Sequence, residues 1–279
     1  MQFTWYVLRL PLPEIRFIVV SKTGAGTTAS RLGHADLGIA SLPDMRAHAE
    51  MIANLDPSTP LIADADTGYG GPIMVARTLD QYIRSGVAGL HIEDQVQTKR
   101  CGHLAGKQLV DTPTYVSRIR AAHAARLRNR SDIVIIARTD ALQSYGYDES
   151  IARLRAARDA GADVAFLEGI VSKDQARQVC KDLAPFPVLL NMVEHGATPT
   201  ISSQEAREMG FRAMIVPFAA IAPAYYAIKE SMEKLKKTGL TGCPEEFTPQ
   251  KLFRVCGVED SMQIDNDAGA AAFAGGIDT

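Results

Sequence analysis

The chain has 279 residues, of which 46% are apolar and 22% are charged, and its formal net charge is −2. This composition is that of a globular protein with enough apolar residues for a large core. Because acidic and basic residues are nearly balanced and interspersed, the sequence gives no support for a surface that binds nucleic acid or an anionic membrane. No apolar run reaches the length of a membrane-spanning helix.

The four cysteines lie far apart and form no CxxC pair, so neither a disulfide framework nor a zinc ribbon is expected. Free thiols favour a reducing intracellular compartment. We expect a cytoplasmic protein, with a mitochondrial or peroxisomal location left open. The apolar N-terminus lacks a basic leader and a small-residue cleavage site, which disfavours secretion. The final residues, GIDT, are not a peroxisomal signal.

Short apolar or β-branched segments recur along the chain, with amphipathic helical segments between them. We expect strands at 17–21, 61–66, 89–94, 133–140, 162–169, 187–193 and 213–218. Their nearly continuous hydrophobicity is typical of parallel strands that are covered on both faces. Several of the helical segments open with Thr, Ser or Asp and end at Gly, as capped helices do.

Strand followed by helix, repeated without a break in composition, predicts one α/β domain. Two architectures compete, an open doubly wound sheet and a (β/α)8 TIM-like barrel. A barrel gathers the carboxyl ends of all its strands around one mouth, whereas an open sheet spreads them along an edge. Five predicted strands end in polar residues, which favours the barrel. These residues are Asp64, Asp66, Glu93, Asp94, Arg138, Asp140, Glu168, Asn191 and Glu194.

The N-terminal βα unit of this barrel is expected to be missing, replaced or irregular. Residues 3–10 have the character of a strand, but only PLPEIR separates them from the next one. That is too short for the crossover helix that a parallel neighbour requires. We therefore expect an atypical N-terminal segment at 1–22, a barrel domain at 23–240 and a C-terminal helical extension at 241–279.

The segment DADTGYGG, which begins at Asp64, is the strongest local pattern. Residues two apart in a strand share a face, so Asp64 and Asp66 are expected to point the same way. Two carboxylates aimed into one mouth repel each other unless a cation lies between them, and a hard divalent ion would fit. Glu93 and Glu168 at other strand ends favour this interpretation over a capped turn. His91 is expected to pack within its strand rather than to bind metal.

Cys101 lies just beyond a predicted strand end, in the loop sequence KRCGH. The neighbouring Lys99, Arg100 and His103 are expected to lower the pKa of its thiol. Gly102 permits a close approach of the backbone to a ligand. Because barrel enzymes carry catalytic groups on such loops, the thiol is expected to transfer a proton or act as a nucleophile. The alternative is an inert loop cysteine.

Two further segments suit a polar ligand. Arg138 stands at an otherwise apolar strand end, where a guanidinium usually binds a carboxylate of the protein or of a substrate. The loop 191–199 offers an amide, a carboxylate, an imidazole and hydroxyl groups.

The segment TGAGTTA at 23–29 fits the dinucleotide fingerprint G-x-G-x-x-G/A. That interpretation needs a second strand that ends in an acid about 20 residues later. Asp44 is the acid found there, and it stands in helical surroundings. A nicotinamide-binding protein is therefore disfavoured.

Taken together, these segments resemble the isocitrate lyase/phosphoenolpyruvate mutase superfamily from about Thr23 to about Gly257. DADTGYGGP, HIEDQ, KRCGH, ARTDA and LEG occur in the order and spacing of that family. TGAGTTASRLG, NMVEHGATP and LFRVCG look most like the fungal branch that contains 2,3-dimethylmalate lyase and oxaloacetate acetylhydrolase. Two departures stand out, since the family normally has an extra βα unit before TGAGTT and often a Tyr near Ser21.

The resemblance implies a barrel that binds Mg²⁺, with Mn²⁺ as a possible substitute, and a homo-oligomer built as a dimer of dimers with exchanged C-terminal helices. It implies that Asp64 binds the metal and that Asp66 and Glu93 hold it largely through water. The catalytic residues it implies are Cys101, Arg138 and Glu168. The residues that match substrate contacts are Thr23, Gly24, Ala25, Gly102, His103, Arg138, Asn191, Thr198 and Pro199.

The activity implied by the resemblance is cleavage of a carbon–carbon bond in a small 2-hydroxy or 2-oxo dicarboxylate, of the 2,3-dimethylmalate or methylisocitrate type. Such cleavage leaves an enolate, which a chelated metal ion stabilises. Arg138 would fix the distal carboxylate, and Cys101 would protonate the departing carbanion. The alternatives are hydrolysis of oxaloacetate and a catalytically inactive binding or scaffold protein.

Overall fold

The computed structural model describes residues 5–9, 18–273 and 275–276. The chain divides into two compact units, Met1–Ile221 and Ala222–Thr279. The predicted boundary at residue 240 differs from this division, which groups most of helix α8 (Ile221–Thr238) with the C-terminal extension.

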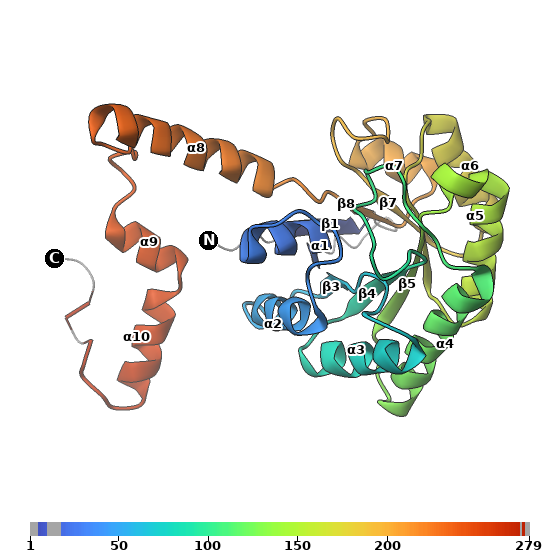
Figure 1. Cartoon of the computed structure of the whole chain (residues 1–279). Helices are drawn as coiled ribbons and strands as arrows, with labels where there is room; N and C mark the ends of the chain where they lie inside the picture. Colours follow the sequence, from blue (N-terminus) through green and yellow to red (C-terminus); the bar gives the residue numbers. More distant parts are fainter. Residues whose placement is uncertain (1–4, 10–17, 274, 277–279) are drawn as a thin grey trace. The chain divides into compact units, whose positions relative to one another are not determined.

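The first unit is a closed barrel of eight strands, with helices around it (Figure 1). In barrel order the strands are β1 (Trp5–Arg9), β2 (Ile18–Lys22), β3 (Leu61–Asp64), β4 (Gly89–Glu93), β5 (Val134–Thr139), β6 (Val164–Leu167), β7 (Val188–Asn191) and β8 (Ala213–Ile215). Each neighbouring pair from β2 to β8 is parallel. The prediction of a TIM-like barrel is confirmed, and each predicted strand segment contains or overlaps one of these strands.

Strand β1 takes the place of the usual first βα unit. It pairs antiparallel with β2, where Trp5 lies opposite Ser21, and antiparallel with β8 on its other side. An antiparallel neighbour needs no crossover helix, so the short connection to β2 is sufficient. Within the atypical segment expected at 1–22, the structure describes β1 and β2, and residues 1–4 and 10–17 lie outside the described part of the chain.

Helices alternate with the parallel strands, and their ends follow local capping chemistry. Asp111 accepts a hydrogen bond from the backbone N of Thr114, and Ser202 forms a capping box with Glu205. The helices are α1 (Gly24–Thr27), the π-helix η1 (Thr28–Leu32), α2 (Leu42–Ala53), α3 (Pro72–Arg84), α4 (Thr112–Arg128), α5 (Leu142–Asp159), α6 (Lys173–Leu183) and α7 (Ser203–Met209).

Two apolar clusters hold the barrel together. The larger one includes Ile135, Ala165 and Leu190 together with buried residues of the helices, so it fills the space between sheet and helices. Successive strand residues point to opposite faces. Their neighbours Ile136 and Phe166 therefore point into the barrel, where they form a smaller cluster with residues of β7 and β8. This packed interior leaves the polar strand ends to line the mouth.

The second unit contains most of α8 together with α9 (Pro249–Val255) and α10 (Val258–Asp267). Along α8 the described structure buries no residue, and several of its large apolar side chains are exposed. Among the described helices, none is both long enough and apolar enough to cross a membrane.

Candidate active site

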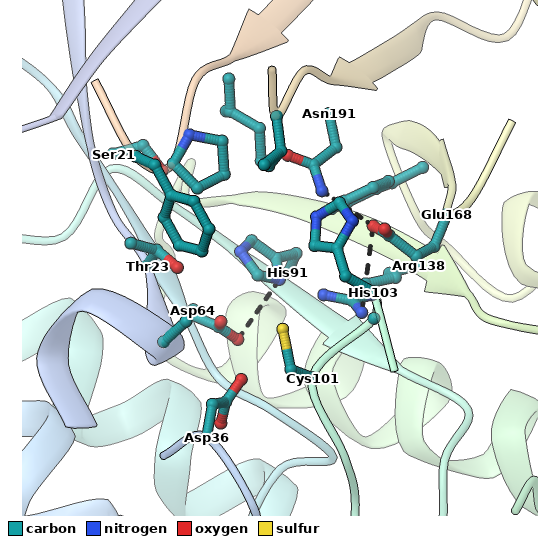
Figure 2. Close-up of a pocket in the computed structure, with 17 residues that line it drawn as sticks. Ser21, Thr23, Asp36, Asp64, His91, Cys101, His103, Arg138, Glu168 and Asn191 are labelled. Atoms are coloured by element: carbon teal, nitrogen blue, oxygen red, sulfur yellow. Dashed lines mark hydrogen bonds and ion pairs between the residues drawn. The ribbon is translucent and has the colours of Figure 1, made fainter. Parts of the chain in front are cut away.

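A pocket of about 470 Å³ lies at the carboxyl ends of the strands (Figure 2). It gathers residues from the parallel strands β2 to β8 or the loops that follow them, as the barrel interpretation requires. The predicted site residues that line it are Thr23, Ala25, Asp64, Cys101, Gly102, His103, Arg138, Glu168 and Asn191. The other lining residues are Ser21, Asp36, His91, Phe166, Val193, Ile215, Pro217 and Phe218.

Five predicted site residues do not line this pocket in the described part of the chain, namely Gly24, Asp66, Glu93, Thr198 and Pro199. Three of them still contact the lining residues or their neighbours: Gly24 binds Asp64, whereas Asp66 and Glu93 are buried and take part in ion pairs. Thr198 is buried in the loop after β7, and Pro199 is partly exposed beside it. The structure therefore gives these last two no visible part in the pocket.

The carboxylates of Asp64 and Asp66 converge at Gly24. Asp64 accepts hydrogen bonds from the backbone N of Gly24 at 2.8 Å and of Asp66 at 2.9 Å. A Cβ at Gly24 would lie 2.6 Å from Asp64 Oδ2 and 3.2 Å from Asp66 Oδ1, so a larger residue would displace them. The prediction that Asp64 and Asp66 converge because they share one face of a strand is wrong. Asp66 lies beyond the end of β3 with a φ of +47°, so a turn brings the carboxylates together rather than a shared strand face.

Lys99 fastens the loop that carries Cys101. Its Nζ lies 2.5 Å from Asp66 Oδ1 and 2.7 Å from Asp36 Oδ1, and only 3% of its side chain is exposed. The backbone N of Cys101 donates to the carbonyl of Asp36 at 3.0 Å. Sequence reasoning treated Lys99 only as a neighbour of the thiol and missed Asp36, because Asp36 lies in a loop without a recognisable motif.

Arg138 lies among buried carboxylates. Its Nε is 2.9 Å from Asp140 Oδ2 and 3.3 Å from Glu93 Oε2, and its Nη2 is 3.9 Å from Glu168 Oε2. Its guanidinium carbon also lies 5.2 Å from the ring centre of Phe166. Burial disfavours the charged form, but the neighbouring carboxylates outweigh it and hold the pKa of Arg138 well above its usual value. Arg138 therefore presents a permanent positive charge to the pocket.

Three atoms of the residues that line the pocket lack hydrogen-bond partners within the described structure, and one of them, His91 Nδ1, lies 3.4 Å from Asp64 Oδ1. Asn191 Nδ2 donates to Glu168 Oε2 at 3.0 Å, which leaves the buried Asn191 Oδ1 without a partner. The buried His103 Nδ1 is also without one. A buried polar atom without a partner costs about 1–3 kcal/mol. Asn191 Oδ1 and His103 Nδ1 are therefore suited to binding a polar group of a ligand, and the substrate contacts implied for these two residues stay predictions.

The thiol of Cys101 points into the pocket from its partly buried loop (Figure 2). Burial raises the pKa of this thiol above its usual value, and the nearby Asp36 acts in the same direction. The expected lowering is therefore wrong, because the effect of burial exceeds the lowering of the pKa by the backbone of His103, Arg138 and Lys99. A thiol that stays protonated at neutral pH is suited to donate a proton rather than to attack as a thiolate.

The acids fit a divalent cation that is held largely through water. Burial raises the pKa of Asp66 to about 6 despite the nearby Lys99, and burial also raises the pKa of Glu93 well above its usual value. This excess of buried carboxylate would be relieved by a cation. In the described residues no three His, Cys, Asp or Glu side chains form a complete metal cage. Mg²⁺ does not need three such ligands, since it usually binds one or two carboxylates and keeps several water ligands.

The segment that fits the dinucleotide fingerprint does not form a dinucleotide-binding turn, in line with the sequence analysis, which disfavoured that site. It forms α1 and η1 beside a closed barrel rather than a turn in an open sheet. Asp44 caps α2, where its carboxylate accepts a hydrogen bond from the backbone N of Ser41 at 2.9 Å. The acid needed for a ribose is therefore occupied in helix capping.

One wall of the pocket is apolar, and sequence reasoning missed it. It consists of Phe166, Val193, Ile215, Pro217 and Phe218. In the sequence these residues look like strand interiors or loop positions, and only the closure of the barrel turns them toward the polar groups.

Comparisons with known proteins agree with the fold. The family model of phosphoenolpyruvate phosphomutase matches residues 13–236. The chain is 37% identical over 228 residues to the 2,3-dimethylmalate lyase of Eubacterium barkeri, with 82% of this chain and 78% of that protein covered. It is 40% identical over 218 residues to the 2-methylisocitrate lyase of Escherichia coli strain K12, with 78% and 72% covered.

Solved structures give the same assignment. The crystal structure of a 2,3-dimethylmalate lyase superposes with a TM-score of 0.92 at 70% identity, covering 93% of this chain and 86% of that one. An oxaloacetate acetylhydrolase in complex with the inhibitor 3,3-difluorooxalacetate superposes with a TM-score of 0.89 at 62% identity, covering 91% and 86%. The family match, the relatives and the shared barrel establish that this chain belongs to the phosphoenolpyruvate mutase/isocitrate lyase superfamily.

Proposed function

We propose that this protein is a Mg²⁺-dependent carbon–carbon lyase that cleaves a small 2-hydroxy or 2-oxo dicarboxylate of the 2,3-dimethylmalate or 2-methylisocitrate type. One observation carries the proposal. A single pocket holds the protonated thiol of Cys101, the cation of Arg138 and the carboxylate of Asp64, each from a different strand end or loop. The similarity to a solved 2,3-dimethylmalate lyase at 70% identity supports the same chemistry.

Each residue has a distinct part in this reaction. Arg138 fixes the substrate carboxylate that is remote from the breaking bond, since its guanidinium is charged and held in place by Asp140. Asn191 and His103 offer free polar atoms to the remaining oxygens of the substrate. As the carbon–carbon bond breaks, the 2-hydroxyl group loses its proton to water and becomes the carbonyl of the first product. The electron pair of the broken bond forms a carbanion beside a carboxylate, and the thiol of Cys101 donates the proton that completes the second product.

Asp64 would bind the cation directly, with Asp66 and Glu93 holding its water ligands, and either Mg²⁺ or Mn²⁺ suits these oxygen donors. When bound, the ion supplies positive charge that stabilises the developing enolate. Gly24 lets the backbone of α1 approach the two aspartates and sets the orientation of the carboxylate of Asp64.

The apolar wall supports a substrate with an alkyl branch. A methyl or methylene group buried against Phe166, Ile215 and Pro217 would contribute about 0.8 kcal/mol of binding free energy. Oxaloacetate has no such branch. Hydrolysis of oxaloacetate to oxalate and acetate is the second candidate, which the similarity to a solved oxaloacetate acetylhydrolase at 62% identity supports.

The test is a product assay with 2,3-dimethylmalate, 2-methylisocitrate and oxaloacetate, each with Mg²⁺ and with excess EDTA. Pyruvate together with propanoate from 2,3-dimethylmalate, abolished by EDTA, is the expected result. Oxalate and acetate formed only from oxaloacetate would overturn the lyase assignment in favour of the hydrolase. No turnover of any diacid, together with no thermal stabilisation by Mg²⁺, would point to an inactive binding or scaffold protein.

For the assembly we propose a homo-oligomer, a dimer of dimers in which C-terminal helices are exchanged between copies. Support comes from α8, which exposes Tyr225, Tyr226 and Met232 and, as described, buries no side chain. Exposed apolar side chains on an amphipathic helix favour a partner surface. Light scattering should give about four times the chain mass of 30.1 kDa, and a monomer mass would contradict the proposal.

For the location we propose the cytoplasm, with support from the four cysteines, all of which are free thiols. Localisation of a fluorescent fusion to mitochondria or peroxisomes would contradict this.

A further inference from the structure

Lys107 is a buried cation for which the proposed reaction has no use. Only 2% of its side chain is exposed, and it is not among the residues that line the pocket. Its Nζ donates to Asp140 Oδ1 at 2.9 Å and to the carbonyl oxygen of Gly102 at 2.7 Å. Burying an ammonium is costly unless it is paired. Its two partners therefore account for its position, and both belong to the active site.

The first partner is the residue that holds Arg138. Asp140 is fully buried and accepts hydrogen bonds from Arg138 Nε at 2.9 Å and Nη2 at 3.1 Å. Lys107 and the Arg138 Nη2 atom thus share the oxygen Oδ1. The backbone N of Asp140 in turn donates to the carboxylate of Asp94 at 2.9 Å. Because Asp94 directly follows β4, this bond fixes the position of Asp140 relative to that strand.

The second partner is the loop that carries the thiol. Gly102 is wedged against the binding groups, because a Cβ there would lie 2.5 Å from Arg138 Nη2 and 2.8 Å from Glu168 Cδ. Lys107 holds the carbonyl of this residue, and Cys101 directly precedes it in the chain. The loop is closed at its base by the bridge between Gln95 and Leu109.

We propose that Lys107 is a positioning residue that couples the Cys101 loop to Arg138, so that proton donor and carboxylate anchor keep a fixed separation. This inference rests on the proposed lyase function. The ammonium of Lys107 binds the loop backbone at Gly102 and, at the same time, the carboxylate of Asp140 that holds Arg138. Loss of this charge would remove the hydrogen bond to the loop backbone at Gly102. It would also leave Arg138 as the only side chain that donates to Asp140 among the described residues.

The test compares Lys107→Met, which keeps the length of the side chain but removes its charge, with Lys107→Arg, which keeps donors for both oxygens. Lys173→Met is the matched control, because Lys173 forms an ion pair with Glu205 between α6 and α7, outside the pocket. Two readouts are needed: kcat and KM with the diacid that the wild type cleaves, and the rate at which iodoacetamide alkylates Cys101 without substrate. Peptide mass spectrometry separates Cys101 from the other thiols, and Cys180 in α6 reports general loosening of the barrel.

In Lys107→Met we expect kcat to fall about 100-fold with a smaller change in KM, since misplacing a reacting group by about 1 Å can cost that much. Alkylation of Cys101 should become about tenfold faster, as expected for the loss of a charge-assisted hydrogen bond, while that of Cys180 stays unchanged. Lys107→Arg should recover most of the lost kcat. Lys173→Met should behave like the wild type in both readouts.

The proposal is overturned if iodoacetamide alkylates Cys101 of the Lys107→Met variant at the wild-type rate. It is also overturned if Cys101 and Cys180 of this variant both react faster, which would indicate general destabilisation. It is also overturned if Lys107→Arg is as impaired as Lys107→Met. A wild-type protein that turns over no diacid would refute the lyase function. The alkylation rates would still decide the coupling role of Lys107 by the same criteria.

Discussion

Cys101 is a proton donor in the proposed mechanism because burial keeps its thiol protonated and its loop directs the sulfur into the pocket. A serine hydroxyl in its place has a far higher pKa and donates poorly. Cys101→Ser should therefore lower kcat by about 10²–10⁴-fold, the usual contribution of general acid catalysis. The increase in melting temperature that we expect from Mg²⁺ should persist, because Cys101 is not one of the three acids proposed to hold the metal.

Steady-state kinetics and thermal denaturation with and without Mg²⁺ check this expectation. Cys243→Ser is the control, since Cys243 is exposed in the C-terminal unit. Full activity in Cys101→Ser would remove the thiol from the mechanism.

Gly102 is constrained by contact rather than by its own backbone freedom. Because a Cβ would collide with Arg138 Nη2 and Glu168, Gly102→Ala must displace the loop or the guanidinium. We expect kcat/KM to fall by about 100-fold, in line with the effect of small displacements of reacting groups. The control is Ala105→Gly, which alters the same loop at an exposed position and should be nearly neutral. Steady-state kinetics of the two variants test this expectation, and their melting temperatures confirm that both fold. An unchanged kcat/KM in Gly102→Ala would contradict the steric argument.

Helix α2 carries a buried titratable group that couples its packing to pH. His48 is 7% exposed, and its Nδ1 lies 3.0 Å from the hydroxyl of Thr27. Burial, with the positive charges of Lys22 and Arg31, lowers the pKa of His48 from 6.5 to about 4. The unfolded chain therefore binds a proton more readily than the folded one between these two values. The associated stability is present above pH 6.5 and is lost as the pH falls toward 4.

We expect the free energy of unfolding to decrease across this range by an amount on the order of 2 kcal/mol from this group. His48→Gln removes the titrating ring and should make the decrease shallower between pH 6.5 and 4. Urea unfolding at a series of pH values measures the slope for both proteins. Equal slopes would show that His48 does not titrate as its burial indicates.

The whole barrel depends on β1, the strand that closes it. Its backbone pairs with both β2 and β8, so its removal would leave two unpaired strand edges. Unpaired edges promote aggregation, and each lost hydrogen bond costs about 0.5–1.5 kcal/mol. Deletion of residues 1–9 should therefore lower the stability by several kcal/mol and increase aggregation. Circular dichroism melting and light scattering of the shortened protein measure both effects, and an unchanged melting temperature would show that the barrel stands without β1.

The sequence by itself determined the repeating architecture and most of the site. Continuous apolar segments identified the parallel strands, and polar residues at their ends placed Asp64, Cys101 and Arg138 at one mouth, since every parallel strand of a barrel ends on the same side. Local patterns are sufficient here because periodicity, caps and strand ends are properties of neighbouring residues.

Only the tertiary structure decided how these residues meet. The antiparallel direction of β1, the bond of Lys99 to Asp36, the protonated state of Cys101 and the apolar wall of the pocket all depend on contacts between distant segments. Lys99 illustrates the reason. Its position near Cys101 in the sequence predicts a lowered thiol pKa. In the structure its ammonium binds two carboxylates, and burial of the thiol raises the pKa by more than Lys99 lowers it. Charge interactions follow distance in space and burial, and neither is fixed by spacing along the chain.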